Sequence, residues 1–123
     1  MTPRRHTQAA TFLPLTPAIH HILLALADQD RHGYAIMQDV AARTDGRMKL
    51  SPGTLYGSIK RMLEDGLIVE LDRRPSPEND DERRRYYRLT RVGREVAQAE
   101  ADRLTTLLRQ ARAAGLTPRR SMS

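Results

Sequence analysis

Basic, hydroxylated and small residues gather in two stretches of the sequence, one after Leu50 and one at an arginine triplet. Lysine, arginine and hydroxyl groups donate hydrogen bonds to phosphate oxygens and base edges, and glycine lets a backbone approach a nucleic acid closely. The residues concerned are Thr54, Tyr56, Gly57, Lys60, Arg61, Arg83, Arg84 and Arg85. We expect this set to contact double-stranded DNA.

The stretch after Leu50 has the signals of an amphipathic helix. Ser51 suits the N-cap, Pro52 the first helical position and Gly66 the C-terminal stop. The apolar stripe consists of Leu55, Ile59 and Met62 with support from Leu63, and the opposite face consists of Gly53, Gly57, Lys60 and Glu64. Taken alone, such a helix is more often an ordinary solvated surface than a DNA-reading one.

A β-hairpin is predicted directly after this helix, and it favours a DNA-reading helix over an ordinary surface helix. Residues 67–71 alternate with a period of two, with Leu67, Val69 and Leu71 on one side. Residues 74–82 form the loop and residues 84–90 the return strand, with Tyr87 and Leu89 pointing inward. A basic-faced helix followed by a two-stranded hairpin is typical of a winged helix-turn-helix.

Acidic side chains complicate the expected wing. Four of them lie in the hairpin loop and would repel phosphate if the tip pressed against DNA: Glu78, Asp80, Asp81 and Glu82. Either the tip points away while the arginines at its base make contact, or the acidic run pairs with those arginines in the free protein. Glu64 is also acidic on the expected DNA face, where it could favour cytosine. The sequence leaves these alternatives open.

Two shorter helices are predicted before the basic one. Thr16 and Pro17 begin the first, which should stop near residues 28–31. Its apolar residues at helical spacing are Ile19, Ile22, Leu23 and Leu26. The second begins around residues 32–34, and Gly46 closes either this helix or the turn after it. Its apolar stripe consists of Tyr34, Met37 and Ala41, flanked by Ile36 and Val40.

A long last helix is predicted from Arg91 to about Ala114, capped by Thr90. Its apolar face consists of Val92, Val96, Leu104, Leu107, Leu108 and Ala111, and its polar face includes Arg94, Glu95, Glu100, Arg103 and Arg109. A helix this long cannot bury its stripe against so small a domain. We expect a homodimer, whose contact residues are Ile19, Leu23, Val96, Leu104, Leu107, Leu108 and Ala111. The alternative is packing onto the first helix within one subunit.

Composition predicts one small basic domain. The chain has 123 residues and a net charge of +6, which favours a polyanionic partner. We expect a flexible arm at residues 1–14, a winged helix-turn-helix at 15–90, a dimerisation helix at 91–114 and a flexible tail at 115–123. The absence of cysteine fits a reducing compartment, and no stretch is long and apolar enough to span a bilayer. We expect a cytoplasmic protein with no membrane partner.

Other function classes lack support in the sequence. His20, His21 and His32 have neither the spacing nor the Cys or acidic partners of a usual metal site. The chain has no Walker A loop, dinucleotide fingerprint, nucleophile elbow or zinc-protease motif. We therefore expect no enzyme activity, no catalytic residues, no metal and no cofactor.

Three motifs together resemble those of the PadR-like transcriptional regulators, a winged-helix family. They are LALADQDRHGYAI, SPGTLYGSIKRMLEDGLI and RRYYRLTRVGR, within residues 15–114. The resemblance implies a homodimer built through the C-terminal helix, often with the first helix, and a palindromic operator. It also implies recognition-helix contacts by Thr54, Tyr56, Lys60 and Arg61, and wing contacts by Arg84 and Arg85. Many family members release DNA when a small aromatic or drug-like molecule binds.

Two features depart from that family pattern. Gly57 occupies a position where the family commonly has proline, and the single C-terminal helix resembles the shorter members. The expected function is a sequence-specific regulator, a homodimeric repressor of a palindromic operator that a small effector could relieve. The alternatives are a non-specific, nucleoid-type DNA-binding protein and a winged-helix adaptor that binds other proteins.

Overall fold

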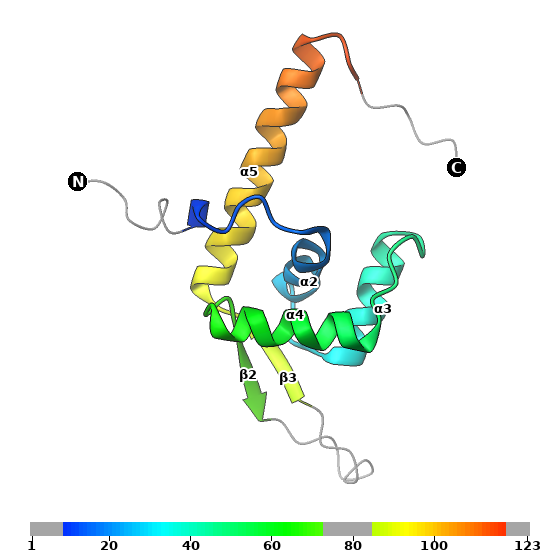
Figure 1. The fold of residues 1–123 in the computed structure, drawn as a ribbon, viewed down its shortest axis with the longest axis vertical. Coiled ribbons are helices and arrows are strands. Elements are labelled where there is room, and N and C mark those ends of the chain that lie inside the picture. The colour runs from blue at the N-terminus through cyan, green and yellow to red at the C-terminus, as the bar shows by residue number, and fades with distance from the viewer. Residues whose placement is uncertain (1–8, 73–84, 118–123) are drawn as a thin grey trace, which may run out of the picture.

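The computed structural model describes residues 9–72 and 85–117, which form a small domain with one long projecting helix (Figure 1). The helices are α2 (Pro17–Ala27), α3 (Gly33–Arg43), α4 (Pro52–Glu64) and α5 (Arg91–Ala113). The strands are β1 (Arg31–His32), β2 (Ile68–Asp72) and β3 (Arg85–Leu89). This mainly α architecture confirms the predicted winged helix-turn-helix with a long C-terminal helix.

Side-chain caps fix where the helices begin. The Thr16, Ser51 and Thr90 hydroxyls accept hydrogen bonds from the backbone N–H groups three residues later, at 3.3, 3.1 and 3.0 Å. These contacts satisfy N–H groups that have no partner inside the helix. His32 caps α3 in the same way, because its Nδ1 accepts from the Ala35 N–H at 3.2 Å. Three of the four caps follow the sequence prediction, and His32 was not predicted.

The sheet has three strands in the order β1-β3-β2, all antiparallel, where two were predicted. Arg31 pairs with Tyr87 on one side of β3, and Ile68 pairs with Leu89 on the other. Tyr87 and Leu89 point inward as predicted. The predicted strand β2 is present, with Ile68 buried and Val69 exposed. Leu67 is buried in the turn before the strand, so β2 begins one residue later than predicted.

The core lies where α2, α3, α4, the sheet and the first half of α5 meet. Its fully buried large side chains include Ile22, Leu23, Ile36, Val40, Leu55, Met62, Leu67, Ile68 and Val96. The stripe predicted for α3 was centred wrongly. Ile36 and Val40 are its buried residues, whereas Tyr34 is 60% exposed. The predicted dimer contacts Leu23 and Val96 must also be corrected, because both are buried inside one subunit.

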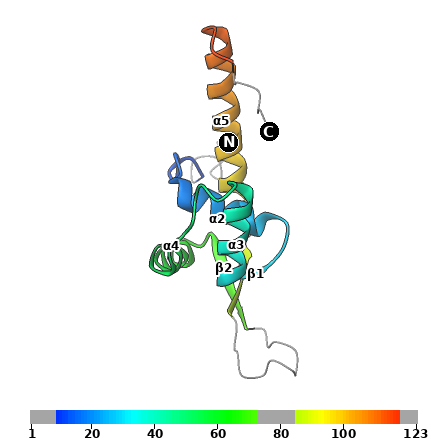
Figure 2. The ribbon, with the colours of Figure 1, turned by 90° about the vertical axis from the view of Figure 1, so that its right-hand side faces the viewer.

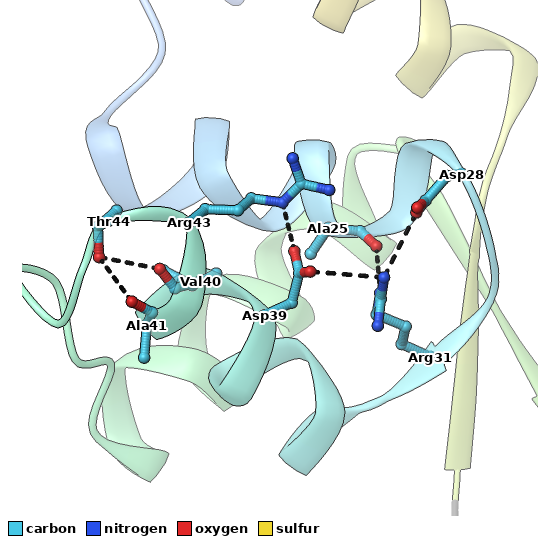
Figure 3. Close-up of polar contacts among 8 residues, drawn as sticks. All are labelled: Ala25, Asp28, Arg31, Asp39, Val40, Ala41, Arg43 and Thr44. Carbon is cyan, nitrogen blue, oxygen red and sulfur yellow. Dashed lines mark hydrogen bonds and ion pairs between the residues drawn. The ribbon is translucent and has the colours of Figure 1, made fainter.

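An arginine network sets α2 against α3 (Figure 3). Arg31 follows α2, and its Nε donates to the Ala25 carbonyl at 2.6 Å. The same guanidinium lies 3.5 Å from Asp28 and 3.4 Å from Asp39 of α3. Arg43 pairs with Asp39 from one turn further on, at 2.6 Å. These contacts join the end of α2 to the middle of α3, so the two helices before α4 are held in a fixed relation.

The N-terminal segment is ordered earlier than expected. Ala9 is buried, and Phe12 and Leu13 pack against the core. The Leu15 N–H donates to the Glu100 carboxylate of α5 at 3.3 Å. The predicted arm at residues 1–14 was therefore wrong for residues 9–14, because their apolar side chains are needed to cover the core.

Helix α5 contributes to the domain only through its first half. Gly93, Val96 and Glu100 are its buried residues, and the second half extends away from the other elements (Figure 1). Glu100 had been predicted on the polar face, and the structure places it inside instead. A Schellman turn ends the helix, with the Leu116 N–H donating to the Ala111 carbonyl at 2.8 Å. None of the described helices is long and apolar enough to cross a bilayer.

Candidate nucleic-acid interface

The outer face of α4 is the best candidate for contact with DNA. The helix lies at one side of the domain and is seen end-on in Figure 2. Its apolar residues Leu55, Ile59 and Met62 are buried against the core. The exposed side carries Thr54, Tyr56, Gly57, Lys60 and Arg61, all of them predicted DNA contacts. The fold therefore brings the predicted helical contacts together on one open face.

The start of α4 presents a hydroxyl in a defined orientation. Ser51 Oγ accepts from the Thr54 N–H and donates its own proton to Thr54 Oγ1, both at 3.1 Å. The Thr54 hydroxyl oxygen is therefore an acceptor in this contact, and its proton remains available for another acceptor. A phosphate oxygen is a suitable one.

Tyr56 is held by a residue that sequence reasoning had not connected with it. The tyrosine is 49% exposed, yet its ring covers Gly33 at the start of α3. A Cβ added to Gly33 would lie 2.3 Å from the Tyr56 hydroxyl oxygen and 2.8 Å from Cζ. Only glycine leaves room for this ring without a shift. The quoted motifs contain both residues, but no spacing rule relates them.

The cationic groups of α4 are free to meet an anion. Lys60 and Arg61 are exposed, and neither forms an ion pair with another residue in the described ranges. Gly57 lies one turn before Arg61, and a Cβ added there would meet nothing within 4 Å. This combination leaves positive charge beside an open stretch of backbone, which suits close approach to a groove.

The base of the wing carries one of the predicted DNA contacts. Arg85 is exposed on β3 and lies 3.6 Å from Glu70 of the neighbouring strand. Arg83, Arg84 and the acidic run of the loop lie outside the described residues, so their expected roles stay predictions. Arg88, also on β3, forms an ion pair with Asp30 and donates to both of its carboxylate oxygens, at 3.1 and 2.9 Å. These hydrogen bonds raise the pKa of Arg88.

A second exposed surface differs sharply in chemistry. Leu104, Leu107 and Leu108 of α5 are 41%, 46% and 37% exposed, on one side of the projecting half. We call these three residues the leucine face. They are all predicted dimer contacts. Ala111, another predicted contact, is half-buried, and Ile19 is half-buried against the core.

A buried carboxylate lies directly below the leucine face. Glu100 accepts hydrogen bonds from Arg103 at 2.6 and 2.9 Å, in addition to the one from Leu15. The Arg103 contact lowers the pKa of Glu100 and outweighs the opposing effect of burial. Burial lowers the pKa of nearby His20, and the Glu100 charge opposes that shift. Within the described ranges, no three His, Cys, Asp or Glu side chains are grouped to hold a metal ion.

Known proteins share both the sequence pattern and this architecture. The family model described as transcriptional regulator PadR-like family matches residues 22–99. The transcriptional regulator Rv3488 of Mycobacterium tuberculosis is 34% identical over 90 residues, which make up 73% of this chain and 78% of that protein. An uncharacterised Lysinibacillus sphaericus protein is 33% identical over 73 residues, covering 59% of this chain and 64% of that one.

A solved structure shows the same fold. A PadR family transcription regulator from Clostridium difficile R20291 superimposes with a TM-score of 0.66 at 23% identity, covering 80% of this chain and 97% of that one. The family match spans well over half of the chain and includes α3, α4 and the hairpin strands. The chain thus belongs to the PadR-like family of transcriptional regulators.

Proposed function

We propose that this protein is a homodimeric, sequence-specific repressor that binds a palindromic operator. In each subunit α4 enters the major groove, and the wing lies on the flanking backbone. The observation that carries this proposal is the outer face of α4, where Lys60 and Arg61 are exposed without an ion pair among the described residues. Exposed cations that make no ion pair within the described ranges are suited to a polyanion.

The dimer follows from the leucine face. The three leucines lie on a part of α5 that no other described element covers, so their side chains stay in contact with water. Apolar surface left in water lacks the stabilisation that its burial would give. A second copy of the same face can cover them, since an antiparallel or crossed pair of identical helices is self-complementary. Two symmetry-related α4 helices then read two half-sites, which should lie about 10 bp apart or a multiple of that.

Selection of bound sequences from random DNA tests the proposal most directly. We expect an inverted repeat, bound at least about 10³-fold more tightly than random duplex. A protein that coats DNA without sequence preference would yield no shared motif. A protein-interaction adaptor would yield no salt-dependent binding to either duplex.

Repression and location complete the proposal. A dimer on an operator that overlaps a promoter blocks the polymerase, so a reporter gene placed behind the selected site should fall in expression when the protein is supplied. This role places the protein in the cytoplasm with the genome and needs no cofactor, metal or catalytic residue. An increase in reporter expression would instead identify an activator.

Relief by a small aromatic or drug-like effector stays a prediction from the family resemblance. Leu23 and Leu26, which could have lined a ligand site at the dimer interior, are buried in the core of one subunit. A hollow of about 400 Å³ lies elsewhere, at the C-terminal end of α3, and is lined by His21, Arg43, Thr44, Asp45, Arg47 and Met48. Operator titrations with and without a panel of aromatic compounds test this part separately.

A further inference from the structure

The end of α4, the return of the wing and the start of α5 meet at one point. The residues that form it are Gly66, Leu67, Thr90 and Gly93, and we call them the joint. Gly66 and Leu67 belong to the turn that closes α4, because the Leu67 N–H donates to the Met62 carbonyl at 2.9 Å. Thr90 directly follows β3 and caps α5. The joint therefore lies between the proposed reading helix and the proposed dimer helix.

Thr90 makes hydrogen bonds to both sides of the joint. Its hydroxyl donates to the Gly66 carbonyl at 2.7 Å and accepts from the Gly93 N–H at 3.0 Å. Its backbone N–H donates to the Leu67 carbonyl at 3.0 Å. One residue thus ties the closing turn of α4 to the first turn of α5.

On the α5 side of the joint, Gly93 leaves no room for a side chain. A Cβ added there would lie 2.0 Å from the Leu67 carbonyl oxygen and 2.9 Å from Leu89 Cδ1. The Leu67 oxygen is a backbone atom that already accepts from Thr90, so it cannot move aside cheaply. Direct contact and hydrogen bonds together hold the angle between the two helices.

That angle has a large effect at a distance. Helix α4 has 13 residues and is therefore about 20 Å long, so with α5 held in place a change of about 10° at the joint displaces the N-terminal end of α4 by about 3 Å. Successive base pairs are about 3.4 Å apart along the helix axis. With the leucine faces fixed against each other, a small change at the joint would shift the N-terminal end of each α4 by about one base-pair step.

We propose that Thr90 is a positioning residue that sets the operator spacing by locking α5 to the closing turn of α4. This inference rests on the proposed function, since it needs a dimer that reads two half-sites. Thr90 itself touches no DNA in this account. It acts through the Gly66 carbonyl, and its hydroxyl proton is the group that matters.

Two substitutions in the full chain separate the joint from the helix cap. Thr90→Asp keeps an oxygen that accepts from the Gly93 N–H but has no proton for the Gly66 carbonyl. Thr90→Ser keeps both contacts and is the matched control. Each protein is titrated against the selected operator and against versions with one or two base pairs added to or removed from the spacer. A duplex with a single half-site reports general effects on DNA affinity, including the added charge.

For the wild type we expect a sharp optimum, with about 10²-fold weaker binding once the spacing forbids both half-sites from being bound together. Thr90→Asp should flatten this preference to about tenfold or less, or move the optimum, beyond any change in half-site binding. Thr90→Ser should follow the wild type. Circular dichroism and sedimentation confirm that each variant is folded and dimeric.

The outcomes distinguish a failure of the positioning role from a failure of the proposed function. If Thr90→Asp is folded, dimeric and keeps the wild-type spacing profile, the positioning role is overturned while the proposed function stands. If the wild type has no preferred operator, or binds as a single subunit, the proposed function fails and the positioning role fails with it. If Thr90→Ser changes the profile as much as Thr90→Asp, the Gly66 hydrogen bond is not the cause.

Discussion

Helices α4 and α5 are both amphipathic and both capped by a hydroxyl, but they leave opposite surfaces in water. Helix α4 buries Leu55, Ile59 and Met62 and exposes polar and cationic groups. Helix α5 buries Val96 and Glu100 in its first half and then exposes the leucine face. The first surface is stable in water and suits a charged partner, whereas the second loses hydrophobic stabilisation until another apolar surface covers it.

The two proposed contacts therefore depend on different kinds of interaction. Contact through Lys60 and Arg61 releases ions from DNA and weakens as salt rises. Contact through the leucine face removes apolar area from water, at about 25 cal/mol per Å², and is much less sensitive to salt. Salt and substitution can therefore break one contact while the other remains.

The largest expected effect comes from charging the leucine face. Leu104→Asp combined with Leu108→Asp should raise the dimer dissociation constant at least about 10²-fold, because carboxylates would be buried without partners. Both side chains are exposed in a single subunit, so its fold should persist. Sedimentation and circular dichroism measure the two properties. Thr106→Asp, on the other side of the same helix, is the control, and a double variant that still sediments as a dimer would refute the interface.

Matched glycine substitutions sharpen the comparison in terms of stability. Gly93→Ala should destabilise the protein by about 1–3 kcal/mol through overpacking, because a Cβ there would clash with the Leu67 carbonyl oxygen. Gly57→Ala should stabilise it by up to about 1 kcal/mol, as expected for an open position within a helix. Urea unfolding at a fixed protein concentration measures both. Equal effects would show that the joint is looser than described.

Removing one cation from α4 should have a smaller effect. Lys60→Ala should weaken operator and random duplex alike, by about three- to tenfold, and reduce the slope of log affinity against log salt by about 0.9. Arg112→Ala removes an exposed cation from the far end of α5 and should leave the slope unchanged. Gel-shift titrations at several salt concentrations give these slopes. An unaltered slope for Lys60→Ala would remove that residue from the interface.

Acidification should give the smallest effect. The folded pKa of Glu100 lies below its ordinary value of 4.5, mainly because of Arg103. The group therefore contributes stability above pH 4.5, and this contribution is lost as pH falls through the folded pKa. The free energies of unfolding of wild type and Glu100→Gln should differ most near neutral pH and converge in acid. Urea titrations at pH 7 and at about pH 4 test this, and a constant difference would contradict it.

His20 should lower the free energy of unfolding over a higher pH range than Glu100 does. Its folded pKa lies below the ordinary value of 6.5, so the unfolded chain binds the proton more readily and stability falls as pH drops below that value. A His20→Asn variant should therefore lose less stability than the wild type between pH 7 and 5.

The elements of the fold were predictable because their signals are local. Ser51 with Pro52, Thr16 with Pro17, and Thr90 each mark a helix start within a few residues. The outer face of α4 was predictable for the same reason, since the periodic burial of Leu55 and its partners leaves the opposite side in water. Both depend on spacing along a single helix.

The remaining features depend on segments that are far apart in the sequence. Strand β1 has only two residues and exists because Arg31 and His32 pair with β3. Glu100 looks like a surface residue until Arg103 and the Leu15 N–H satisfy its carboxylate. The contact of Tyr56 with Gly33 likewise has no periodic signal. The same limit explains why Val96 and Leu104 seemed equivalent on one stripe while only Val96 meets the core.

The open space around Gly57 has a consequence for how such a regulator could diverge. The position lies in the middle of the exposed face of α4, and a new side chain there would touch no other part of the subunit. A single substitution could add a base-contacting group while also favouring the helical state. Descendants of this chain could thus acquire new target genes at this position without weakening the scaffold.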